Sequence, residues 1–120
     1  MNSPENNLYI WVDWESSGIW LENGSNADYK SFDLPKDLVR RFEFWTRWFS
    51  DQKCEYSDEK NNMDRKLFNN YGRALAIDVK LFVGEEWRVF YGHKTDADIV
   101  EILLKRNLYE KTVPVAVAGK

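Results

Sequence analysis

The stretch GRALAIDVKLFVG, residues 72–84, decides how the chain can fold. At about 100° per residue, the helix predicted over residues 64–83 shows two apolar sectors and one narrow polar strip. A helix that is apolar on most sides is usually buried on most sides. The pattern therefore predicts a helix that packs against two neighbours and ends at Gly84, since glycine is favoured just beyond a helix.

Asp78 falls at the seam between the two apolar sectors of this helix. The broad sector holds Phe68, Tyr71, Gly72, Leu75, Val79, Phe82 and Val83, the second holds Leu67, Ala74, Ile77 and Leu81, and the polar strip holds Asn69, Arg73, Ala76 and Lys80. A buried carboxylate is costly unless it is paired. We therefore predict that Asp78 is a structural tie to a Trp N–H, a Tyr O–H or an Arg. A functional acid is the alternative.

Strand patterns precede and follow the helical region. Apolar side chains alternate in residues 8–14, Ile19–Leu21 reads as a second strand, and Asn23-Gly24 is a strong hairpin signal. A short third strand over Tyr29–Phe32 would complete an antiparallel meander. Residues 86–91 alternate again and predict a late strand.

Two more helices are expected. Pro35 suits the first turn of one, and an apolar stripe follows it at spacings of three and four. The stripe consists of Leu38, Phe42, Trp45 and Phe49. Thr95 and Asp98 resemble a capping box, which predicts another helix over residues 96–106 that covers the second sector of the 64–83 helix. The sequence thus predicts an α+β fold: one single domain over residues 1–120. It has a single small sheet, formed by an N-terminal hairpin or meander plus one late strand, packed against about three helices.

Composition narrows the function classes. The chain of 120 residues has a net charge of −3, so it lacks the basic field of a nucleic-acid-binding protein. Its one cysteine, Cys54, excludes an intrachain disulfide and fits a reducing cytoplasm. We find no secretory signal, no run long enough for a membrane span and no metal or phosphate-binding motif. We therefore predict a cytoplasmic protein without cofactor or metal.

The acidic residues gather in the N-terminal third. Residues 1–34 hold six acids against one lysine, a balance of −5. An acidic surface with aromatic anchors favours a basic partner. Paired carboxylates at Asp13 and Glu15 or at Glu85 and Glu86, with the single histidine His93, leave a small metal-dependent hydrolase or nuclease as an alternative. Solvated strand ends explain the same acids without any chemistry.

Spaced aromatic residues around a GR-x-LA core carry a resemblance to a known group. The residues that carry it, aromatic and other, are Trp11, Ile19, Trp20, Leu34, Pro35, Phe42, Trp45, Phe49, Phe68, Gly72, Arg73, Leu75, Ala76, Gly84, Trp87, Val89 and Tyr91. Over residues 8–92 the chain resembles small bacterial immunity proteins associated with contact-dependent growth-inhibition toxins and related polymorphic toxins. It departs from the group in the apolar character of residues 77–82 and in the apolar segment at 96–106.

The resemblance implies a non-enzymatic α/β protein that binds and neutralises a cognate toxin domain, often a nuclease. It carries over no catalytic residue and no interface residue. From the charge distribution we predict that the partner-binding surface consists of Asp13, Trp14, Glu15, Trp20, Glu22, Asp28 and Asp33. The partner would be the toxin protein itself, with no direct nucleic-acid or membrane binding. A structural or adaptor subunit that uses exposed aromatic residues is a further alternative.

Overall fold

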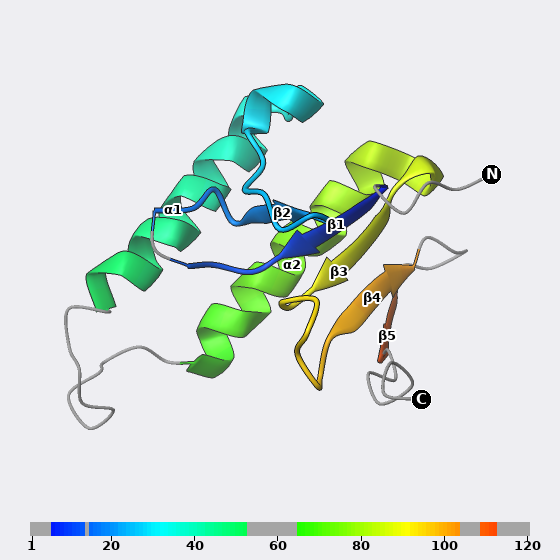
Figure 1. The fold of residues 1–120 in the computed structure, drawn as a ribbon. Helices are drawn as coiled ribbons and strands as arrows, with labels where there is room; N and C mark the ends of the chain where they lie inside the picture. The colour runs from blue at the N-terminus through cyan, green and yellow to red at the C-terminus, as the bar shows by residue number, and fades with distance from the viewer. Residues whose placement is uncertain (1–5, 14, 53–64, 104–108, 113–120) are drawn as a thin grey trace.

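The computed structural model describes residues 6–13, 15–52, 65–103 and 109–112, the last range as backbone only. Five strands form one mixed sheet, and two long helices lie against it (Figure 1). The strands are β1 (Asn7–Ile10), β2 (Ile19–Leu21), β3 (Arg88–Tyr91), β4 (Val100–Leu103) and β5 (Tyr109–Thr112). The helices are α1 (Lys36–Gln52) and α2 (Arg65–Val83), with short 3-10 turns η1 (Tyr29–Phe32) and η3 (Gly84–Glu86).

The sheet has the strand order β2-β1-β3-β4-β5. The early pair β1–β2 is antiparallel, as expected for an N-terminal hairpin, and β1 pairs with the late strand β3 in parallel. Along the chain, both helices lie between β1 and β3. They form the long crossover that two neighbouring parallel strands require. Strands β4 and β5 extend the sheet by antiparallel pairing beyond β3. The predicted α+β class is therefore correct, while the sheet is larger than expected.

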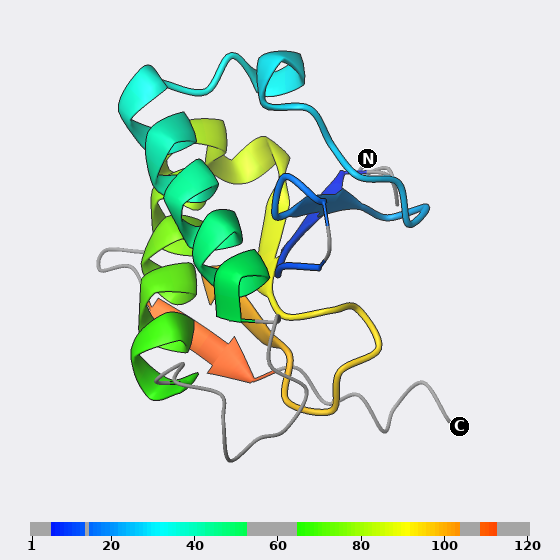
Figure 2. The ribbon, with the colours of Figure 1, turned by 90° about the vertical axis from the view of Figure 1, so that its left-hand side faces the viewer.

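The two faces of the sheet have different environments. Both helices lie on one face, and the loop between β3 and β4 curls over the other (Figure 2). The alternation predicted for residues 8–14 is confirmed where the structure describes them, since Leu8 and Ile10 lie in the core under the helices. Tyr9 lies on the opposite face in a second cluster with Phe90 and Ile99. The helix-free outer face is thus lined by aromatic side chains.

The helix predicted over residues 96–106 is wrong. Its described part contains β4, which pairs antiparallel with β3 through the partners Val89 and Ile102. The capping-box pattern instead shapes a turn, because Asp96 Oδ2 accepts a hydrogen bond of 2.8 Å from the backbone N–H of His93. The apolar run is rich in β-branched residues, and pairing satisfies the free edge of β3. Residues 104–106 lie outside the described residues.

The third strand of the predicted meander is also wrong. Residues Tyr29–Phe32 form the 3-10 turn η1, capped by Asp28, whose side chain accepts from the backbone N–H of Lys30. Edge pairing with β2 is supplied instead by an isolated bridge between Trp20 and Asn26. Asp and Asn side chains compete with strand pairing by bonding the nearby backbone, which explains the turn.

The described residues contain no third long helix, so the predicted burial of the α2 faces is partly wrong. The strip of α2 that was predicted to be polar and exposed is partly buried, since Ala76 and Lys80 lie in the protein interior. The buried Lys80 donates a hydrogen bond of 2.6 Å from Nζ to the backbone carbonyl of Trp87. The second apolar sector remains outside, with Leu67 and Leu81 each more than half exposed. No helix among the described residues is both long and apolar enough to cross a membrane.

Asp78 has the structural partner that the sequence suggested. Arg41 Nη1 of α1 donates to Asp78 Oδ2 of α2, so the ion pair ties the two helices together. The side chains are 38% and 37% exposed, so the pair lies at the surface of the helix layer and not at a buried seam. The predicted partner type is therefore correct, and the predicted cover by another helix is wrong.

Candidate binding surfaces

The predicted acidic residues lie on separate surfaces. Asp13 and Trp20 line a hollow on the outer face of the sheet, together with His93 and Lys94. Asp28 and Asp33 line a second hollow beside η1 and the beginning of α1. Glu15 lines neither hollow. Trp14 is outside the described residues.

Glu22 is committed to a hydrogen-bond network. One of its carboxylate oxygens accepts from the Tyr9 hydroxyl at 2.6 Å and from Asn7 Nδ2 at 3.0 Å, and Lys94 Nζ lies 3.6 Å from the other. Burial opposes ionisation of Glu22, but these hydrogen bonds and the charge of Lys94 outweigh it and lower its pKa. Burial, with the hydrogen bond and charge of Glu22, raises the pKa of Tyr9 to about 12. Glu22 therefore links β1, β2 and the β3–β4 loop.

Trp20 has a structural contact as well as partial exposure. Its indole N–H donates to the carbonyl of Trp11 at 3.0 Å, and the two rings stack with centroids 5.3 Å apart. His93 meets Trp11 edge-on at 4.7 Å. Trp11, Trp20 and His93 thus form an aromatic group on the outer face, with one ring from the segment after β1, one from β2 and one from the loop after β3.

Three of the predicted acids keep exposed carboxylates. Glu15 and Asp33 both adopt positive φ, and Asp28 caps η1, so all three have a backbone role. All three side chains are nevertheless exposed, and no ion pair within the described residues involves them. Their charge is therefore displayed to solvent, from Asp28 and Asp33 in the hollow beside η1 and from Glu15 outside that hollow.

The carboxylates of the hydrolase alternative do not converge. Strands β1 and β3 are parallel and in register, and Asp13 and Glu15 follow β1 whereas Glu85 and Glu86 precede β3. The two acidic pairs therefore lie toward opposite ends of the sheet. Within the described ranges, no group of three or more His, Cys, Asp or Glu side chains is placed to hold a metal ion. The structure contradicts a shared site for these acids.

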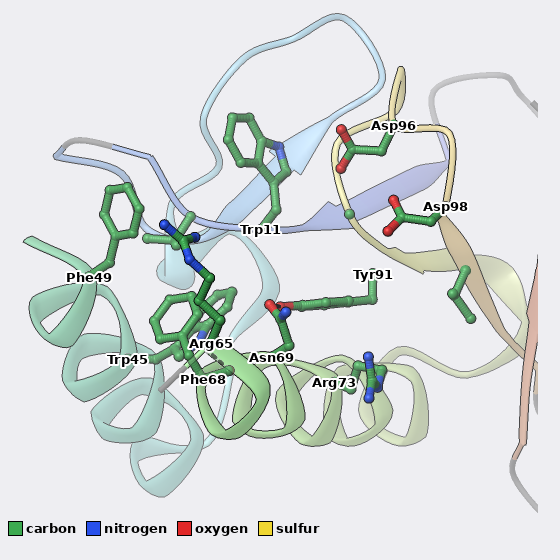
Figure 3. A pocket seen from close by; sticks show the side chains of 13 residues that line it. Trp11, Trp45, Phe49, Arg65, Phe68, Asn69, Arg73, Tyr91, Asp96 and Asp98 are labelled. Atoms are coloured by element: carbon green, nitrogen blue, oxygen red, sulfur yellow. Dashed lines mark hydrogen bonds between the residues drawn. The ribbon is translucent and has the colours of Figure 1, made fainter. Parts of the chain in front are cut away.

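A cavity that the sequence analysis did not predict opens between α2 and the β3–β4 loop (Figure 3). Its volume is about 280 Å³. Trp45, Phe68 and Tyr91 are among its aromatic lining residues, while Arg65 and Asp98 bring opposite charges. The lining residues come from segments far apart in the chain, so no local motif could have indicated the cavity.

An apolar hollow lies on the outer surface of the two helices. Phe44, Trp48 and Tyr71 contact one another there, with ring centroids between 5.5 and 6.1 Å apart. Phe44 is 56% exposed and Leu67, which also lines the hollow, is 55% exposed. The second apolar sector of α2 was a signal for this surface, although we predicted that another helix covers it.

Comparisons with protein-family models, curated proteins and solved structures find no match to this chain. The resemblance to immunity proteins is therefore untested by these comparisons.

Proposed function

We propose that the chain is an immunity-type binding protein that neutralises a cognate, basic toxin domain in the bacterial cytoplasm. The observation that supports this proposal is the display of Glu15, Asp28 and Asp33 as exposed carboxylates without an ion pair among the described residues. A nuclease active site attracts a polyanion and is therefore basic. Exposed acids on the inhibitor speed its association with such a site.

The network around Glu22 changes which residues test the proposal. Charge reversal at Glu22 would break its bonds to Tyr9 and Asn7, and a binding loss would then report misfolding. The informative variant is Glu15→Gln/Asp28→Asn/Asp33→Asn. Asparagine caps helical turns as aspartate does and tolerates positive φ, so the two asparagine substitutions remove charge and preserve the backbone roles.

The experiment measures association of each variant with the proposed cognate toxin domain, over a series of salt concentrations. Neutralising three attractive charges is expected to lower affinity about tenfold at low salt, mainly through the association rate. The matched control, Asp51→Asn/Glu85→Gln/Glu86→Gln, neutralises three other exposed acids. Equal affinity and equal salt dependence for both triple variants would refute the acidic interface.

The apolar hollow on the helices favours a second candidate, a structural or adaptor subunit that binds through aromatic contacts. The variant Phe44→Ser/Leu67→Ser removes two exposed apolar groups from this surface. Loss of binding in this variant, with binding retained in the acidic triple variant, would assign the interface to the helices and not to the N-terminal acids.

A further inference from the structure

The side of α2 that faces away from the core carries an apolar stripe. Leu67, Ala74 and Leu81 follow one another at intervals of seven residues, a spacing that returns to nearly the same side of a helix after two turns. Leu67 and Leu81 are 55% and 57% exposed, and Ala74 is exposed between them. The core-facing residues of α2, such as Phe68 and Val79, are buried. The stripe therefore presents a leucine at each end and a small residue at its centre.

The stripe is symmetric about Ala74, since Leu67 and Leu81 lie equally far from it in opposite directions along the helix. If a second copy of α2 ran antiparallel across Ala74, its Leu81 would meet Leu67, and its Leu67 would meet Leu81. A two-fold interface requires this kind of self-complementarity. Apolar residues at heptad spacing form the seam along which helices pack, and a small residue at the crossing point lets the two backbones approach closely.

The apolar hollow on the two helices adjoins one end of this stripe. Leu67 lines the hollow together with Phe44 and Trp48. Leu81 of an antiparallel copy would therefore lie at the rim of the hollow, near Phe44, which is 56% exposed. By symmetry, the same contact would form a second time, about 21 Å away along the helix axis. The large apolar side chains that the described residues expose are Phe44, Leu67, Leu81 and Phe82, so all of them belong to the two helices.

The exposed charges at the two ends of α2 favour the same arrangement. Lys66 lies in the first turn, which holds no acidic residue, and Glu85 and Glu86 follow directly after the last turn. Lys66 and Glu85 form no ion pair within the described residues. Each charge is unfavourable beside the dipole of α2, because a helix is positive at its N-terminus and negative at its C-terminus. An antiparallel copy would place the basic beginning of one helix beside the acidic end of the other, whereas a partner of one sign would suit only one end.

We infer that two copies of the chain associate through antiparallel packing of α2, with the two-fold axis at Ala74. The contact includes none of the acids Glu15, Asp28 and Asp33, so this inference goes beyond the proposed toxin binding and does not depend on it. An interface built mainly from one helix of each copy is small, which predicts a weak dimer.

The first test measures the mass of the protein in solution. In sedimentation equilibrium from about 5 to about 500 µM, the weight-average mass should rise from 14.3 kDa toward twice that value, with a dissociation constant of about 100 µM. Leu81→Asp places a charge in the seam twice and is expected to keep the mass at the value of one chain. Its circular dichroism should match the wild type, because Leu81 is more than half exposed. A wild-type mass of one chain over the whole range, or undiminished association of Leu81→Asp, would overturn the inference.

Disulfide trapping tests the position of the axis. The background is Cys54→Ser, which removes the one cysteine of the chain. Ala74→Cys places two cysteines at the axis, where Cα atoms about 4.4–6.8 Å apart permit a disulfide, so copper phenanthroline and oxygen should yield a covalent dimer. Leu67→Cys is the matched control, since its two copies would lie about 21 Å apart in an antiparallel pair and meet only in a parallel one. A disulfide formed by Leu67→Cys and not by Ala74→Cys would overturn the inferred axis.

Charge exchange tests the antiparallel direction. Lys66→Glu and Glu85→Lys are each expected to raise the dissociation constant about fivefold, and the double variant is expected to restore it, because the pair re-forms with its signs exchanged. A double variant that is weaker than either single variant would overturn the pairing. No toxin is present in these measurements, and toxin binding can be measured at concentrations far below the expected dissociation constant of the dimer. Failure of the dimer and failure of the proposed function are therefore distinguishable.

Discussion

Gly72→Ala tests the packing at the centre of the fold. A Cβ at residue 72 would lie 2.5 Å from Trp45 Cζ2 and 2.6 Å from Tyr91 Cε1. Carbon atoms in contact are normally about 3.5–4.0 Å apart, so both rings would have to retreat by about 1 Å. Trp45 is fully buried, stacks on Phe68 and is held by its own hydrogen bond, so it has little freedom to move.

The expected effect is a balance of two opposing contributions. Alanine in a helix interior is favoured over glycine by about 1 kcal/mol, and overpacking of a core costs about 1–3 kcal/mol. Contacts this short on two rings place the cost at the upper end of that range. We therefore expect Gly72→Ala to lower the free energy of unfolding by about 2 kcal/mol, which lowers Tm by roughly 8 °C for a chain of this length.

The assay is urea unfolding at 25 °C, followed by circular dichroism. The exposed residue Ala74 provides the control on the same helix, since Ala74→Gly should cost about 1 kcal/mol and so measures the helix-propensity contribution alone. Trp45→Phe makes room beside residue 72, so Gly72→Ala should cost less in that background than in the wild type. A Gly72→Ala protein as stable as the wild type, or additive effects in the double variant, would refute the close contact.

Two further predictions concern polar ties. Asp78→Asn is expected to lower the free energy of unfolding by only about 0.5–1 kcal/mol, because the Arg41–Asp78 pair is more than one-third exposed. A double-mutant cycle with Arg41→Gln should measure this coupling energy at low salt, and most of the coupling should disappear at high salt. Binding of Asp78→Asn to a partner should be preserved. The raised pKa of Tyr9, about 12 in the folded protein against about 10 in the unfolded chain, implies stability that is present below pH 10 and is lost as the pH rises from 10 to 12. Chemical denaturation at several pH values should show a smaller loss in this interval for Tyr9→Phe, and an unchanged loss would contradict the raised pKa that burial and the Glu22 hydrogen bond give Tyr9.

Some features of the candidate sites followed from local sequence and others did not. The displayed acids Glu15, Asp28 and Asp33 were predictable, because short polar turns are almost always exposed. The role of Glu22 was not, since its partners Tyr9 and Asn7 lie 13 and 15 residues away and come into reach only when β2 pairs with β1. The cavity between α2 and the β3–β4 loop likewise depends on lining residues from separate elements, such as Arg65 and Asp98.

By itself, the sequence determined the elements with strong periodicity: the alternating strands β1 and β3 and the two long helices. Their patterns reflect local geometry, which repeats every 2 or about 3.6 residues whatever the neighbours are. The tertiary structure alone decided the short apolar segment at 99–103, which suits a helix or a strand and became β4 because the edge of β3 needed a partner. The packing of α1 on α2 also makes Arg41, 37 residues away in the chain, the partner of Asp78. The second apolar sector of α2 remains exposed.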